Sequence, residues 1–185
     1  HEAGNRIVDM VKEDLKIGDI LTREAFENAI KINAAIGGST NFIIHLLAIA
    51  GRVGVELDIK DFDHLSEDIP LLVNLMPSGK YLMEDFCYAG GVPAVMGELR
   101  KAGRIHQGAM TATGRTMGEN LAPWQSEDTD VIKSYDAPMR ENAGFLVLSG
   151  NLFDSALMKT SVISKDFRER FLLKPGAEGI HEARA

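Results

Sequence analysis

Cysteine is almost absent from this sequence, because Cys87 is the only one among 185 residues. A disulfide within the chain is therefore impossible, and the chain alone cannot bind a metal or an iron–sulfur centre through several thiolates. The aromatic neighbours Phe86 and Tyr88 favour a buried, unreactive thiol. So little cysteine is typical of a reducing compartment, and we expect a cytoplasmic protein.

Long apolar runs and basic clusters are also missing. The longest apolar stretch is far shorter than the roughly 20 residues of a membrane-spanning helix. The formal net charge is −7, which argues against nucleic acid or an anionic membrane as the main partner. No Ser/His/Asp arrangement and no pair of histidines at metal-binding spacing stands out. We therefore expect no nucleic acid, no membrane and no metal to bind this chain alone.

The residues that are present are those of an ordinary globular protein, with 45% apolar and 25% charged residues. In residues 1–125, helical patterns alternate with short apolar runs, which predicts part of a parallel α/β/α layered domain. Residues 126–143 are polar and rich in turn formers, and we interpret them as a linker or domain edge. Residues 144–185 contain short β-like runs and are predicted to begin a separate β domain.

Five patterns define the expected elements of the first domain. Residues 5–16 form an amphipathic helix, and residues 23–36 form a second helix that begins after Thr22 and ends at Gly37. Residues 41–54 are apolar nearly all round, so that helix is expected to be buried in the core. Residues 55–70 read as a short strand and a short acidic helix. Residues 70–76 are typical of a buried parallel strand.

The corner "GGSTN", residues 37–41, is the first candidate binding site. Its glycines allow close approach of a ligand, and the N-terminus of the next helix favours an anion such as a carboxylate or phosphate. Ser39, Thr40 and Asn41 add short hydrogen-bonding side chains. A glycine stop followed by a Ser/Thr cap explains the same residues without a ligand, and the residues themselves favour this simpler interpretation. His45, one turn later, is expected to be a hydrogen-bonded core residue.

The segment "SGKYLMEDF", residues 78–86, is the second candidate. Ser78 and Lys80 follow the predicted strand, and ligands of parallel α/β layers bind beyond the carboxyl ends of strands. Glu84 and Asp85 could bind a hard cation together with ligands from elsewhere, or they could simply form a solvated helix start.

Four segments, in order along the chain, carry a resemblance to a known family. They are "NAAIGGSTNFIIHLLAIAGRVGVELDIKDFD", "LMPSGKYLMEDFCYAGGVPAVMGEL", "TATGRTMGENL" and "GNLFDSALMKTSVIS", which runs on into "KDFRERFL". This pattern resembles the dihydroxy-acid dehydratase, phosphogluconate dehydratase and sugar-acid (aldonate) dehydratase family, with the fourth segment closer to the sugar-acid branch.

The resemblance implies a hydro-lyase that converts a 2,3-dihydroxy acid or aldonate to a 2-keto acid. It implies an iron–sulfur cluster held by three cysteines, a magnesium ion and a serine base, with the cysteines, the serine and most of the magnesium ligands outside this chain. We therefore expect a middle fragment of a longer, homo-oligomeric protein, with the first strands of a C-terminal β-barrel at its end. The fragment alone is expected to be inactive, with no catalytic residue and no bound cofactor.

The resemblance also raises the prospect that the corner contacts a small hydroxy acid. The substrate-binding candidates are Ser39, Thr40, Asn41, Ser78 and Lys80. A stand-alone, cofactor-free α/β domain that binds a ligand or serves as a scaffold remains the alternative.

Overall fold

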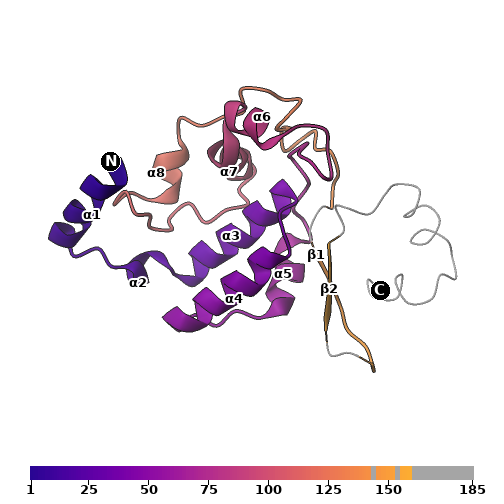
Figure 1. Ribbon diagram of the computed structural model, residues 1–185, viewed down its shortest axis with the longest axis horizontal. Helices are drawn as coiled ribbons and strands as arrows, with labels where there is room; N and C mark the ends of the chain where they lie inside the picture. The colour runs from indigo at the N-terminus through magenta and orange to yellow at the C-terminus, as the bar shows by residue number, and fades with distance from the viewer. Residues whose placement is uncertain (143–144, 153–154, 160–185) are drawn as a thin grey trace, which may run out of the picture.

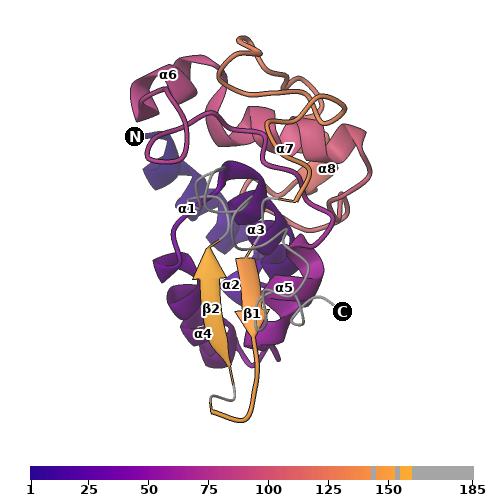
Figure 2. The same ribbon diagram turned by 90° about the vertical axis from the view of Figure 1, so that its right-hand side faces the viewer.

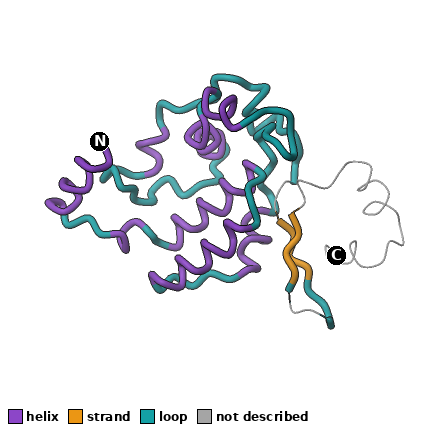
Figure 3. Tube along the Cα trace, in the orientation of Figure 1, coloured by secondary structure: helices purple, strands orange, loops and turns teal. Residues whose placement is uncertain are grey.

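The computed structural model describes residues 1–142, 145–152 and 155–159, and in this part of the chain helices dominate (Figure 1). The helices are α1 (Glu2–Glu13), α2 (Ile17–Ile20), α3 (Arg23–Ile36), α4 (Asn41–Val53), α5 (Ile59–Ser66), α6 (Met83–Tyr88), α7 (Gly91–Lys101) and α8 (Met117–Leu121). The strands β1 (Phe145–Leu148) and β2 (Ala156–Lys159) form an antiparallel hairpin. Short turns join α1 through α5 and α6 to α7, and longer loops precede α6, α8 and β1 (Figure 3).

Helix α3 lies between two hydrophobic cores (Figures 1 and 2). It begins as predicted, because the hydroxyl of Thr22 accepts a hydrogen bond from the Ala25 N–H at 3.4 Å. One core joins α3 to α4, α5 and β1 through residues such as Ile30, Phe62 and Phe145. The other joins α3 to the segment 69–73, α6, α7 and α8 through residues such as Ala34 and Leu99. Burial of these side chains is the main stabilising contribution.

Polar contacts also hold α3 in place. The Arg23 guanidinium donates to both carboxylate oxygens of Asp61 on α5, at 2.6 and 3.1 Å, and to Glu27 at 2.8 Å. Glu27 in turn lies 2.7 Å from the His106 ring. The buried Asn28 amide donates to the His106 carbonyl and accepts from its N–H. These bonds join three segments that are far apart in the chain.

The same contacts shift the pKa of two carboxyl groups. Hydrogen bonding from Arg23 lowers the pKa of Asp61, against an opposing contribution from burial. For Glu27, burial raises the pKa, but hydrogen bonds from Arg23 and His106 outweigh it and the pKa is lowered. Both carboxylates therefore stabilise the folded state at pH values above their pKa in the unfolded chain. This stabilisation is lost as the pH falls through their lower pKa in the folded chain.

The expected parallel strand at residues 70–76 is not present as such. The segment is extended and buried, but Leu71 and Val73 make single antiparallel bridges to Arg140 and Ile132. Leu75 makes a single parallel bridge to Tyr81. The hydrophobic pattern predicted burial correctly for residues 70–73 but not for Met76, which is 56% exposed, and the direction of pairing depends on residues 132–140, which run antiparallel to the segment.

Residues 55–58, expected to begin with a short strand, show a similar difference. No strand forms at 55–58, where Asp58 caps α5 by accepting from the Lys60 N–H at 3.0 Å. Met110 and Thr116 make one antiparallel bridge before α8. The described residues thus combine helices with one small sheet, which is compatible with the α/β class.

Residues 126–142, predicted to be a linker or domain edge, contribute Val131 and Ile132 to the core beside α7. The division of the chain at 125 and 143 stays a prediction. Most of the predicted β domain, residues 160–185, lies outside the described residues, and so do 143–144 and 153–154.

The helices α1 and α4 leave much of their apolar surface exposed. No residue of α1 is buried, and Val11 is 76% exposed. The expectation that α4 is buried all round was wrong: Ile43 and Leu46 face α3 and α5, but Ile44 is 68% exposed. In the described part of the chain, α4 is covered on only one side. None of the described helices has the length and apolar character needed to span a membrane.

Candidate functional site

The corner between α3 and α4 is built by two glycines. Gly37 has a left-handed backbone with φ 69°, and its N–H donates to the Ala34 carbonyl at 3.0 Å. The Gly38 N–H donates to the Asn33 carbonyl at 2.8 Å. This pair of bonds is the Schellman arrangement, which satisfies the last carbonyls of a helix. The prediction that Gly37 ends α3 is therefore confirmed.

The residues after the glycines leave several polar groups without a partner among the described residues. Ser39 Oγ accepts from the Asn41 N–H at 3.2 Å, so one donor of α4 is satisfied. Thr40 is the N-cap of α4, but its side chain makes no capping bond. Within the described residues, no hydrogen bond uses the N–H of Ser39 or the N–H of Thr40. Two backbone donors, the Thr40 hydroxyl and the exposed Asn41 amide thus surround the positive end of a 13-residue helix.

Asn33 lies directly beneath this corner, and the sequence analysis did not single it out. Its side chain is only 8% exposed, and its Nδ2 has no hydrogen-bond partner among the described residues. A Cβ at Gly38 would lie 1.9 Å from Asn33 Oδ1, so only glycine fits above the amide. A polar residue on an otherwise apolar face, four positions before Gly37, is the sequence signal that could have identified it.

The second candidate segment forms a compact loop before α6. The Lys80 N–H donates to Asn74 Oδ1 at 2.9 Å, and its ammonium lies 5.2 Å from the centre of the Tyr81 ring. Ser78 Oγ is buried without a hydrogen-bond partner. The loop follows a segment whose Leu72 N–H donates to the Ala35 carbonyl at 2.8 Å, next to the end of α3.

The five substrate-binding candidates thus form two groups. Residues 39–41 lie at the corner, while Ser78 and Lys80 lie in the loop before α6. No hydrogen bond or ion pair between described side chains joins the two groups. Both adjoin the same core, because Ile36 and Leu75 pack against it.

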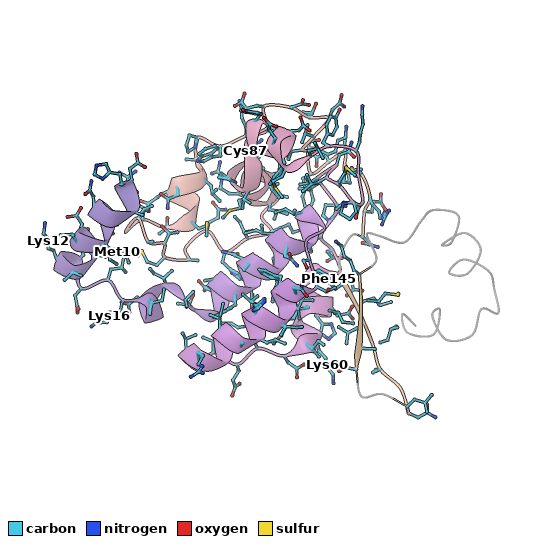
Figure 4. The ribbon with its side chains drawn as sticks, in the orientation of Figure 1. Met10, Lys12, Lys16, Lys60, Cys87 and Phe145 are labelled. Atoms are coloured by element: carbon cyan, nitrogen blue, oxygen red, sulfur yellow. The ribbon has the colours of Figure 1, made fainter. Side chains whose placement is uncertain are left out.

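Three other expectations about polar residues are settled by the structure. Cys87 is exposed rather than buried, because Phe86 occupies the inward face of the six-residue helix α6 (Figure 4). His45 is exposed as well, since it lies on the uncovered side of α4. Asp85 Oδ2 accepts from the Leu82 N–H at 2.9 Å, so this carboxylate serves as the cap of α6.

Comparison with known proteins identifies the family. Residues 1–120 match the family described as "Dihydroxy-acid/6-phosphogluconate dehydratase N-terminal". The chain belongs to this family. The whole chain is 53% identical to the "D-xylonate dehydratase" of Caulobacter vibrioides, of which it covers 31%.

Other members of the dehydratase family match over slightly shorter stretches. The "L-arabinonate dehydratase" of Rhizobium leguminosarum is 51% identical over 87% of this chain and 28% of its own length. The "Dihydroxy-acid dehydratase" of Caldicellulosiruptor saccharolyticus is 45% identical over 87% of this chain and 29% of its own length. The chain therefore spans about a third of the length of the curated relatives it matches.

The residues of this chain do not fit the iron–sulfur cluster that the family resemblance implies. Three thiolates are needed, and the chain has one cysteine. Among the described residues there is also no group of three or more His, Cys, Asp or Glu side chains placed to bind a metal ion. No chemical step is therefore assigned to such a group here.

Proposed function

We propose that this chain is a segment of a hydro-lyase that removes water from a sugar acid, an aldonate, to give a 2-keto acid. The observation that carries the proposal is the order of identities among the relatives. Those named for the sugar acids D-xylonate and L-arabinonate are 53% and 51% identical to this chain, whereas the relatives named dihydroxy-acid dehydratase reach 45%.

Within that enzyme, we assign the corner at residues 39–41 to binding the substrate. The free N–H groups of Ser39 and Thr40 suit a carboxylate oxygen, and the amide of Asn41 can both donate and accept with a hydroxyl group. Lys80 and Ser78 supply a cation and a hydroxyl from the neighbouring loop. Such groups bind and orient the substrate, and no proton transfer is assigned to them.

The rest of the proposal concerns the larger protein. Cluster thiolates, magnesium ligands and the catalytic serine are contributed by other parts of the polypeptide, and this chain alone is inactive. The helices belong to a layered α/β domain, and the antiparallel pair β1–β2 begins a β-barrel. The enzyme is a cytoplasmic homo-oligomer, a proposal supported by exposed apolar side chains such as Val8, Val11, Met83 and Tyr88.

A chimera tests the function directly. This chain replaces the matching segment of the Caulobacter vibrioides D-xylonate dehydratase, and 2-keto acid formation is measured with D-xylonate, L-arabinonate and a branched 2,3-dihydroxy acid. We expect the two aldonates to be dehydrated with higher kcat/KM than the branched acid. A folded chimera that prefers the branched acid, or that dehydrates none of them, contradicts the proposal.

Variants of the same chimera test the corner. Thr40→Val and Asn41→Ala are expected to raise KM for D-xylonate about tenfold or more, because each removes a hydrogen bond to the substrate. Asn5→Ala, at an exposed position of α1, is the matched control. If KM is unchanged in both corner variants, the corner does not bind the substrate. The proposed reaction would still stand.

The alternative, a stand-alone binding or scaffold domain, has a separate test. The isolated chain is titrated with D-xylonate by calorimetry in the absence of metal ions. Saturable binding favours the alternative, and no heat of binding favours the segment of a larger enzyme.

A further inference from the structure

A shallow pocket lies apart from the corner, between α3, α5 and the turn that follows α7. Its volume is about 210 Å³, and its lining includes Lys31 from α3, His64 from α5 and Arg104 from the turn. Asp68 is the single acidic residue of the lining. A chain with a net charge of −7 thus brings three basic side chains together at one place.

Arg104 and Lys31 are only weakly neutralised by the protein, whereas His64 lies close enough to Asp61 to help lower the pKa of that carboxyl group. The shortest distance between Arg104 and Asp68 is 3.7 Å, and the Asp68 side chain is 76% exposed, so this pair is loose and strongly screened. Lys31 has neither a hydrogen bond nor an ion pair in the described part of the chain. Most other cations near α3 and α7 are paired, as Arg23 is with Asp61 and Lys101 with Glu98.

Arg104 is held in place by an aromatic side chain. Its Nε donates to the Tyr135 hydroxyl at 2.8 Å, and its guanidinium lies 5.9 Å from the centre of the Tyr135 ring. That hydroxyl donates in turn to the Asp68 carbonyl at 3.2 Å. These contacts use the Nε atom of Arg104 and leave its Nη2 atom without a partner among the described residues. An oriented guanidinium with a free nitrogen is well suited to an oxyanion.

The size of the pocket limits the class of ligand. Its volume of about 210 Å³ lies below the roughly 300–1,000 Å³ of sites that enclose a complete organic ligand. It is several times the roughly 30 Å³ that a water molecule occupies in the liquid. A phosphate-sized group fits, while the remainder of a larger molecule would extend into solvent.

We propose that the pocket formed by Lys31, His64 and Arg104 is a binding site for a phosphate group, either inorganic phosphate or a phosphate monoester. A tetrahedral oxyanion can accept hydrogen bonds from several directions. Here the donors come from two helices and a turn, since Lys31 lies on α3, His64 on α5 and Arg104 on the turn after α7. The pocket shares no residue with the proposed substrate corner. It is therefore a second, separate anion site, and its test is independent of the dehydratase activity.

The test uses the 185-residue chain and measures backbone amide chemical shifts of Gly103 and Arg104 by NMR. The chain is titrated with inorganic phosphate, with glycerol 1-phosphate as a monoester, and with malonate, at constant ionic strength maintained with sodium chloride. We expect saturable shifts with both phosphates and weaker binding of malonate. Shifts that do not saturate, or equal affinity for malonate, overturn the assignment to phosphate.

Charge variants locate the site. Lys31→Gln is expected to weaken phosphate binding about fivefold, which is the upper range for a partly exposed ion pair. It leaves the contact between Arg104 and Tyr135 in place. Lys60→Gln on α5 removes the same charge outside the pocket lining and should change the affinity less than twofold (Figure 4). Equal weakening by both variants would show a general effect of charge and overturn the proposal.

Discussion

Helices α3 and α1 are both amphipathic, yet the structure uses them very differently. Helix α3 contributes to two cores and buries six residues, including Ile30 and Asn28. Helix α1 buries none, and its apolar residues Ile7, Val8 and Val11 are each more than half exposed. An apolar stripe thus indicates which face of a helix can be covered, but a neighbour of matching shape is needed to cover it. Four paired substitutions test this comparison.

The largest difference is expected for apolar truncation. Ile30→Ala should lower the free energy of unfolding by about 3–4 kcal/mol, because Ile30 is fully buried and its loss leaves a cavity. Val11→Ala should change it by less than about 0.5 kcal/mol, since Val11 is 76% exposed. Urea unfolding followed by circular dichroism measures both. A large effect of Val11→Ala would show that α1 is covered in solution, for example by a second copy of the chain.

The next effect concerns buried amides. Asn28→Ala should cost about 2 kcal/mol, because the partly buried N–H of His106 loses its partner and the His106 carbonyl keeps only a long 3.5 Å hydrogen bond from the Ala109 N–H. Asn5→Ala in α1 removes an exposed side chain and should be nearly neutral. The same urea experiment compares them, and hydrogen exchange of the His106 amide reports the local loss. Unchanged exchange in Asn28→Ala would contradict the role given to this amide.

Glycine substitutions should act in opposite directions. Gly38→Ala should destabilise by roughly 1–3 kcal/mol, because the new Cβ would collide with the Asn33 amide. Gly4→Ala has open space and should stabilise α1 by up to about 1 kcal/mol through helix propensity. Thermal unfolding measures the loss of stability in Gly38→Ala. The helix content measured by circular dichroism reports the effect of Gly4→Ala. A neutral Gly38→Ala would mean that Asn33 can move aside at little cost.

The smallest effect concerns paired ions. Arg23→Gln should cost about 1 kcal/mol at pH 7, since Arg23 is 39% exposed and solvent screens its pairs. The low pKa values of Asp61 and Glu27 stabilise the fold above about pH 4, and this contribution is lost as the pH falls further. The variant should therefore show a smaller loss of stability between pH 6 and pH 3. Arg6 likewise lowers the pKa of its partner Glu13, but this pair is exposed on α1, so Arg6→Gln should change the pH profile less than Arg23→Gln does.

The local signals in the sequence were accurate where neighbouring residues decide the outcome. Thr22 caps α3 and Gly37 ends it, as expected. At the candidate site, the glycine stop was predictable because φ near +70° is accessible to glycine. The free N–H groups of residues 39 and 40 could not be predicted from the sequence, because they depend on the backbone conformation that Ser39 adopts.

Features that depend on distant residues were missed. Cys87 was expected to be buried because of its aromatic neighbours, but α6 turns Phe86 inward instead. The pairing of Val73 with Ile132 joins segments that no local pattern relates. The basic pocket combines Lys31, His64 and Arg104, which are 33 or more positions apart in the sequence.

The sequence by itself determined the family and the two ends of α3, because ordered motifs, caps and glycine stops act over a few residues; the first helix, expected at residues 5–16, instead spans Glu2–Glu13. Only the tertiary structure decided which apolar faces are covered, which charges are paired and where three basic side chains meet. Burial and electrostatic contacts depend on distance in space. That distance is set by the packing of helices α3, α5 and α7 and not by any pattern within one of them.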